Sequence, residues 1–211
     1  AGTPLDTRAE AFARSLIDLA DDRMADGEWL TRSRRRFSLA EQAIRDKARS
    51  GQGGGKGGGR RRSARNTEEM RSAMGFASEY LASRFLAEKH KERYDDRCWV
   101  SENRGLLEVD WEGDDTLGFD FVVRTADVEW RYEVKSNLND EFEFEFSQNE
   151  MRVAAECSSD GTRKYRILYV PFVFDPSRWQ VMQLPNPLSR DGRNLFREIG
   201  AGATRLKFQL E

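Results

Sequence analysis

Asp120, Glu133 and Lys135 are the residues whose types and spacing could do chemistry together. They belong to two stretches, 118–124 and 128–135, in which apolar and polar residues alternate as in half-buried strands, with a short turn between them. If Asp120 lies opposite Glu133 in a hairpin, every apolar residue of one arm meets an apolar partner. A slip by one residue would turn that apolar set to the wrong face, so the matching predicts the register. The predicted pairs are Phe121 with Tyr132, Val123 with Trp130 and Arg124 with Glu129.

This register sets two carboxylates opposite each other, with Lys135 two residues on and on the same face. Like charges opposed across strands are destabilising, so a cation must compensate them. Lys135 is one candidate and a divalent metal is another. Hard oxygen ligands on rigid strands suit Mg²⁺ or Mn²⁺, and a neighbouring lysine could hold and polarise an attacking water. The group has the outline of a phosphodiesterase site, and the alternative interpretation is a solvated strand face that carries scattered charges.

Five stretches around these residues form a recognisable pattern. They are, in chain order, Gly75-Phe76-Ala77-Ser78-Glu79, Leu117-Gly118-Phe119-Asp120, Tyr132-Glu133-Val134-Lys135, Phe146-Ser147-Gln148-Asn149-Glu150 and Tyr165-Arg166-Ile167-Leu168-Tyr169-Val170. Together they resemble the C-terminal domain of the plant protein NO VEIN, which also occurs in bacterial proteins beside ATPase or helicase modules, many of them linked to phage defence. The resemblance covers roughly residues 68–185 and implies a restriction-endonuclease-like fold of the PD-(D/E)xK nuclease superfamily, with Glu79, Asp120, Glu133 and Lys135 as the site.

Glu79 lies on a long helix that the sequence predicts from Thr67 onward, with a buried apolar stripe along one face. It sits beside that stripe, about one turn after Gly75, where a glycine would let the helix approach another backbone closely. The resemblance places a site carboxylate here, reaching a metal through water. The alternative is a glutamate on the helix surface.

The elements after the hairpin predict an α/β domain. Residues 141–146 alternate strictly, so Phe142, Phe144 and Phe146 are expected in the core and the glutamates between them outside. Ser147 and Glu150 form a capping box for a helix over 148–157. The remaining expectations are a central strand at 164–172, a strand at 179–184, a short helix at 195–199 and a terminal strand at 206–210.

The predicted architecture is a mixed β-sheet flanked by helices, with a helical module before it. We expect the helical module at 1–50, a flexible Gly/Arg-rich linker at 51–66 and the nuclease-like domain at 67–211. The first 65 residues hold 15 basic and 9 acidic residues, a net charge of +6 in a chain of net charge −2. Nucleic-acid contacts are therefore expected here, although a solvated face, a contact to an acidic partner protein or a plain tether explains the same residues. The candidates are Arg34, Arg35, Arg36, Arg60, Arg61 and Arg62.

The inventory of residues excludes several chemistries. The single histidine, His90, comes late in a charged helix, which argues against a histidine-based triad and a Cys/His zinc cluster, and we expect it to be an exposed helix residue. The two cysteines are expected to be free thiols. No apolar run approaches the roughly 18 residues of a membrane span and no signal peptide is visible, which favours a cytoplasmic protein without a membrane partner.

The sequence therefore predicts a Mg²⁺- or Mn²⁺-dependent nuclease acting on DNA, with Asp120, Glu133 and the carbonyl of Val134 as metal ligands and Lys135 positioning the water. Because it has no phosphate-binding loop, any ATPase or helicase must be a partner or a fused domain. From Asp127 to Glu150 there are eight acids and two bases, which repel a phosphate backbone, although salt screens this beyond about 8 Å. The alternative is a catalytically inactive interaction or sensor module that docks on a partner protein.

Overall fold

The structure is a computed structural model, and it describes residues 7–25, 68–107, 112–139, 141–198 and 204–208. Of the residues expected to contact nucleic acid, all six arginines at 34–36 and 60–62 lie outside these ranges, as does the expected linker. Among the described helices, none has both the length and the apolar character needed to cross a membrane.

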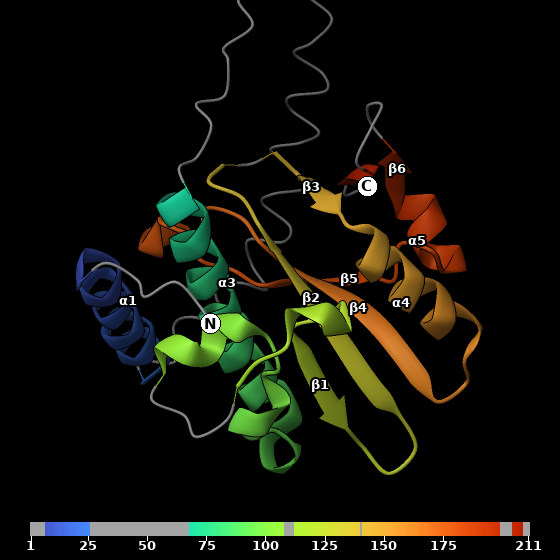
Figure 1. The fold of residues 1–211 in the computed structure, drawn as a ribbon, viewed down its shortest axis with the longest axis horizontal. Helices are drawn as coiled ribbons and strands as arrows, with labels where there is room; N and C mark the ends of the chain where they lie inside the picture. Colours follow the sequence, from blue (N-terminus) through green and yellow to red (C-terminus); the bar gives the residue numbers. More distant parts are fainter. Residues whose placement is uncertain (1–6, 26–67, 108–111, 140, 199–203, 209–211) are drawn as a thin grey trace, which may run out of the picture.

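The main sheet has four strands: β1 (Phe121–Arg124), β2 (Glu129–Ser136), β4 (Arg163–Val170) and β5 (Met182–Pro185). Their order across the sheet is β1-β2-β4-β5 (Figure 1). β2 and β4 are parallel, while the two outer pairs are antiparallel. The predicted mixed α/β class is confirmed, and so is the central position of the strand that begins near residue 164.

Two helices lie on opposite faces of this sheet: α3 (Glu68–His90) and α4 (Gln148–Ser159) (Figure 1). Because successive side chains of a strand point to opposite faces, some contact the core under α3 and others the core under α4. Tyr132, Val134 and Leu168 point into the core that α3 covers. Tyr165 and Ile167 point into the core that α4 covers. Side chains of β2 therefore reach both faces, with even-numbered residues on the α3 side and odd-numbered residues on the other.

A second, antiparallel sheet completes the core on the α4 side. Its strands are β3 (Glu143–Phe146), β6 (Phe196–Glu198) and β7 (Thr204–Phe208), in the order β3-β7-β6. Phe142, Phe144 and Phe146 are buried, as the alternation predicted. The predicted helix at 195–199 is wrong. A helix α5 (Arg190–Leu195) ends there, and Phe196 instead pairs with Phe208 and packs into the core.

The N-terminal helix α1 (Thr7–Ala25) packs on α3. Leu16 and Ala20 enter the same core as the apolar face of α3. Asp21 accepts hydrogen bonds from Tyr80 and Arg84, each at 2.8 Å, which fixes the contact at one point of α3.

Short 3₁₀ helices make up much of the connection between α3 and β1, where Trp99 forms a single antiparallel bridge with Phe121. His90, the last residue of α3, is half-buried, and its Nε2 lies 2.8 Å from the hydroxyl of Tyr132, so the prediction of an exposed histidine is wrong. The 3₁₀ helices of this connection are η1 (Lys91–Arg93), η2 (Asp96–Cys98), η3 (Glu102–Leu106) and η4 (Asp115–Leu117), and a further one, η5 (Pro176–Arg178), lies between β4 and β5.

Candidate functional site

The hairpin of β1 and β2 has the register that the sequence predicts. Phe121 faces Tyr132, Val123 faces Trp130 and Arg124 faces Glu129. Asp120 precedes β1 by one residue, and its backbone N–H donates to the carbonyl of Tyr132 at 2.9 Å, which continues the ladder toward Glu133. The two carboxylates therefore come from facing positions of two neighbouring chains.

The Asp120 side chain is anchored to the backbone of β2. Its Oδ2 accepts the N–H of Val134 at 2.7 Å. Within the described residues no donor contacts the second oxygen, Oδ1, which leaves it available to a ligand. Gly118, two residues before Asp120, has φ +75°, a backbone conformation that side-chain-bearing residues rarely adopt. A Cβ there would also lie 3.0 Å from Val153 Cγ2, so a glycine is required where the chain turns from η4 toward Asp120.

Lys135 joins two acids from different elements. Its ammonium lies 2.8 Å from Glu133 Oε1 and 2.7 Å from Glu150 Oε2. Glu150 also closes the capping box of α4, since its carboxylate accepts the Ser147 N–H while the Ser147 hydroxyl accepts the Glu150 N–H. One glutamate thus positions the start of α4 and binds the lysine of β2.

Burial and mutual repulsion perturb the ionisation of this group. Burial, and then the charge of Asp120, raise the pKa of Glu133 well above its ordinary value; the residue is only 6% exposed. Burial and the charge of Glu79 likewise raise the pKa of Asp120. Burial alone would lower the pKa of Lys135, but the carboxylates of Glu133 and Glu150 raise it, so the ammonium keeps its proton. When its acids are ionised, the site therefore holds more negative charge than one lysine compensates.

Glu79 is buried on α3 and is held by donors from the segment that follows this helix. Trp99 Nε1 donates to its Oε2 at 2.7 Å. The hydroxyl of Ser101 donates to the same oxygen, and the Asn103 amide donates to Oε1. A carboxylate offers about four lone-pair positions, so three protein donors leave it about one for water. The alternative of a surface glutamate is wrong, because Glu79 is 4% exposed.

Burial raises the pKa of Glu79 to about 7, against the three donors, which lower it. The charge of Glu133 contributes in the same direction as burial, so Glu79 belongs electrostatically to the same group as the hairpin acids. Gly75, one turn earlier, makes room for a side chain and not for another backbone, since a Cβ there would lie 3.1 Å from Asn103 Nδ2. Glycine at position 75 therefore leaves room for the side chain of Asn103, which donates to Glu79.

The donor set is suited to a hard cation with few protein ligands. Among the described residues, no group of three or more His, Cys, Asp or Glu side chains is arranged to hold a metal ion. Two carboxylates, Asp120 with its unpartnered Oδ1 and Glu133, remain as the candidate ligands. Mg²⁺ keeps several waters and is commonly bound by one or two carboxylates, so this set fits Mg²⁺ better than a metal that needs a full protein cage.

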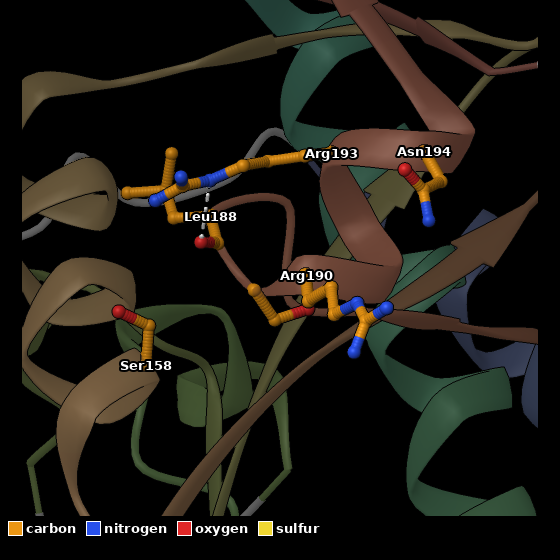
Figure 2. A pocket seen from close by; sticks show the side chains of 6 residues that line it. Ser158, Leu188, Arg190, Arg193 and Asn194 are labelled. Carbon is orange, nitrogen blue, oxygen red and sulfur yellow. Dashed lines mark hydrogen bonds between the residues drawn. The ribbon is translucent and has the colours of Figure 1, made fainter.

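A surface pocket lies elsewhere, between the end of α4 and the start of α5 (Figure 2). Ser158, Arg190 and Arg193 are among its lining residues, and Arg193 Nε donates to the carbonyl of Leu188 at 3.1 Å. None of the residues predicted for the site lines this pocket. The candidate site is a cluster of charged side chains at the start of β1, apart from this pocket.

Comparison with known proteins gave a match to one family model over part of the chain. Residues 78–182, just under half of the chain, match the family described as Protein NO VEIN, C-terminal. The residues predicted for the carboxylate site, Glu79, Asp120, Glu133, Val134 and Lys135, lie within the matched segment, and the resemblance derived from the sequence is confirmed for that segment. Neither the curated proteins nor the solved structures gave a match to this chain. The finer assignment to the PD-(D/E)xK nuclease superfamily stays a prediction.

Sequence reasoning missed Glu150 as a member of the cluster and the three donors to Glu79. The sequence predicted a capping role for Glu150, because the capping box marks where α4 begins. Its contact with Lys135 was not predictable, because that contact depends on how the helix packs. Trp99, Ser101 and Asn103 carried no local signal, since they are 20 to 24 residues from Glu79 along the chain.

Proposed function

We propose that this domain is a metal-dependent nuclease that hydrolyses phosphodiester bonds, with Mg²⁺ or Mn²⁺ as its cofactor and DNA as its substrate. The observation that carries the proposal is the pair of carboxylates, Asp120 and Glu133, at facing positions of one hairpin beside a charged lysine. Burying like charges together costs folding free energy, so a fold that keeps them has a use for a cation there.

Each residue has a role in this proposal. Asp120 presents Oδ1 and Glu133 presents its carboxylate as ligands, and the carbonyl of Val134 is a candidate third ligand. When bound, the metal polarises the phosphate and stabilises the charge that develops during attack. Lys135 keeps its proton and therefore cannot act as a base; it orients the attacking water and stabilises negative charge on the phosphate oxygens. Glu79 holds a water from the α3 side with its remaining lone pair.

Cleavage assays on supercoiled plasmid and on single-stranded circular DNA test the proposal. The wild-type protein should cut in Mg²⁺ or Mn²⁺ and not in EDTA, and Asp120→Ala and Lys135→Ala should each lose cutting. Matched controls are Glu145→Gln and Lys207→Ala, which remove the same charges at exposed positions of β3 and β7. The proposal fails if the wild-type protein cuts neither substrate with either metal, or if the site variants cut as well as the controls.

A second function is favoured by one observation. Lys135 already lies between Glu133 and Glu150, so the cluster has partial internal compensation. Glu141, just before β3, and Glu145 in β3 are exposed acids, which repel phosphate. A catalytically inactive module that docks on a partner protein, such as an ATPase or helicase, would keep these features. It predicts no cleavage and no stabilisation of the fold by Mg²⁺.

A further inference from the structure

The sheet carries a basic and aromatic surface on its α3 side, separate from the carboxylate cluster. We define the Trp130 surface as Lys89 of α3, Trp130 of β2, and Lys164 and Arg166 of β4. The parallel register places Lys164 directly beside Trp130, and Arg166 is beside the next residue on the same face, Tyr132. Residues of three elements therefore lie on this face, with the Lys164 ammonium at the carbonyl of Asp160.

Cations lie over the ring of Trp130. Arg166 Cζ is 5.5 Å from its centroid and Lys89 Nζ is 6.0 Å away. The indole stacks beside the fully buried ring of Tyr132, with centroids 6.2 Å apart and an interplanar angle of 17°. Trp130 itself is half-buried and rests on this rigid support.

The charges of this surface are not compensated by the protein. Lys89 donates to the amide oxygen of Gln183, a neutral group, and Lys164 Nζ donates to a backbone carbonyl at 3.3 Å. In the part of the chain that the structure describes, no carboxylate forms an ion pair with Lys89 or Arg166. His90 adds little charge, since burial and then the charges of Lys89 and Arg93 lower its pKa to about 4.

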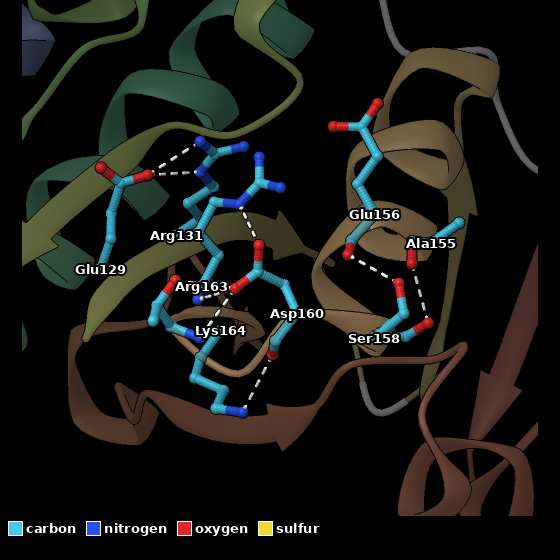
Figure 3. Close-up of polar contacts among 10 residues, drawn as sticks. Glu129, Arg131, Ala155, Glu156, Ser158, Asp160, Arg163 and Lys164 are labelled. Atoms are coloured by element: carbon cyan, nitrogen blue, oxygen red, sulfur yellow. Dashed lines mark hydrogen bonds and ion pairs between the residues drawn. The ribbon is translucent and has the colours of Figure 1, made fainter. Parts of the chain in front are cut away.

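The opposite face of the same strands provides an internal comparison. There, Arg131 NH2 lies 2.8 Å from Glu129 Oε1 and Arg163 Nε lies 2.7 Å from Asp160 Oδ2 (Figure 3). The basic residues on that face are satisfied within the protein, whereas those of the Trp130 surface are left for an external anion.

We propose that the Trp130 surface binds single-stranded nucleic acid. Lys89, Lys164 and Arg166 bind consecutive phosphates, and a base stacks on the indole. A partly exposed aromatic residue among cations that form no ion pair with a carboxylate matches a ligand that carries both negative charge and flat apolar rings, which an acidic peptide lacks. Duplex DNA fits less well, because its bases are already stacked on one another.

This surface would bring a strand toward the carboxylate cluster. Ten residues of α3 separate Lys89 from Glu79, a distance of roughly 15 Å along the helix axis. The use of the bound strand as substrate rests on the proposed nuclease function, but binding does not. A binding assay in EDTA, where metal-dependent cleavage cannot occur, therefore distinguishes failure of one proposal from failure of the other.

The test measures fluorescence anisotropy of a labelled oligothymidylate with the full chain in EDTA, over a series of salt concentrations. Trp130→Leu keeps an apolar side chain and should weaken binding by roughly 5- to 150-fold, the range for loss of one stacked base, while Trp130→Phe should restore most of the affinity. Lys89→Gln and Arg166→Gln should each lower the salt slope of log K by about 0.7, as expected for one phosphate contact to a single strand.

The control is Arg152→Gln on α4, which removes one exposed positive charge from the opposite side of the sheet and should change neither affinity nor slope. Thermal melting of each variant separates loss of binding from loss of fold, and Lys89→Gln, at an exposed position, keeps the test valid if the Trp130 variants unfold. The proposal is overturned if Lys89→Gln and Arg166→Gln bind like the wild type. It is also overturned if polyglutamate binds as tightly as the oligonucleotide while Trp130→Leu has no effect.

Discussion

The side-chain nitrogen of Lys135 lies 2.7 Å from Glu150 Oε2, which links the second strand of the hairpin to the first turn of α4. The same nitrogen lies 2.8 Å from Glu133 Oε1. One cation therefore stabilises two acids from different elements, in a region where Asp120 adds a further negative charge.

Replacement of Lys135 by methionine should destabilise the metal-free protein strongly at pH 8. The change leaves Glu133 and Glu150 without their cation, and an uncompensated buried charge costs roughly 3 kcal/mol. At pH 5 the loss should be smaller, because acids with raised pKa values take up protons and lose their charge. Urea denaturation at both pH values measures the difference, with Lys207→Met as the control. An equal loss at the two pH values would contradict this account.

Glu79 should make the metal-free protein less stable as the pH rises from about 4.5 to about 7. Burial raises its pKa in the folded state from 4.5 to about 7, so the folded protein holds a proton that the unfolded chain has released. Stability is then highest at low pH and falls by roughly 3 kcal/mol across this window, since one pKa unit corresponds to about 1.4 kcal/mol. Glu79→Gln resembles the protonated acid and should remove this part of the pH dependence. A Gln variant with the slope of the wild type would exclude Glu79 as its source.

Mg²⁺ should stabilise the fold at pH 8 through Asp120. The carboxylates lose protons when they bind a cation, so calorimetry in buffers of different ionisation enthalpy should report proton release. The increase in melting temperature at saturating Mg²⁺ should be lost in Asp120→Asn and kept in Glu145→Gln. An unchanged increase in Asp120→Asn would place the bound ion elsewhere.

Gly118→Ala should destabilise the protein by about 2 kcal/mol, because a Cβ costs 1 to 2 kcal/mol at positive φ and would also crowd Val153. Gly161→Ala is the matched control, since a Cβ there meets nothing within 4 Å. Thermal denaturation of the two variants compares them directly. Similar melting temperatures would show that the turn before Asp120 tolerates a side chain.

The sequence predicted those features that depend on pairing between neighbouring segments. Apolar matching was enough to give the register of β1 and β2, because only one alignment buries every apolar residue of the hairpin. The capping box at Ser147 was equally local. The contact of Glu150 with Lys135, the donors to Glu79 and the strand at Phe196 were not predictable in this way. They depend on segments that meet only after the sheets have formed.

The position of β7 has a consequence for the order in which the domain assembles. β7 lies between β3 and β6, so the hydrogen bonds of β3 must wait for a strand that begins some 60 residues later, at Thr204. During synthesis on the ribosome, the phenylalanines of β3 emerge long before the strand that covers them. Closure of this sheet is therefore a late, long-range event, of the kind that slows folding, and until then a nascent chain exposes an aggregation-prone edge.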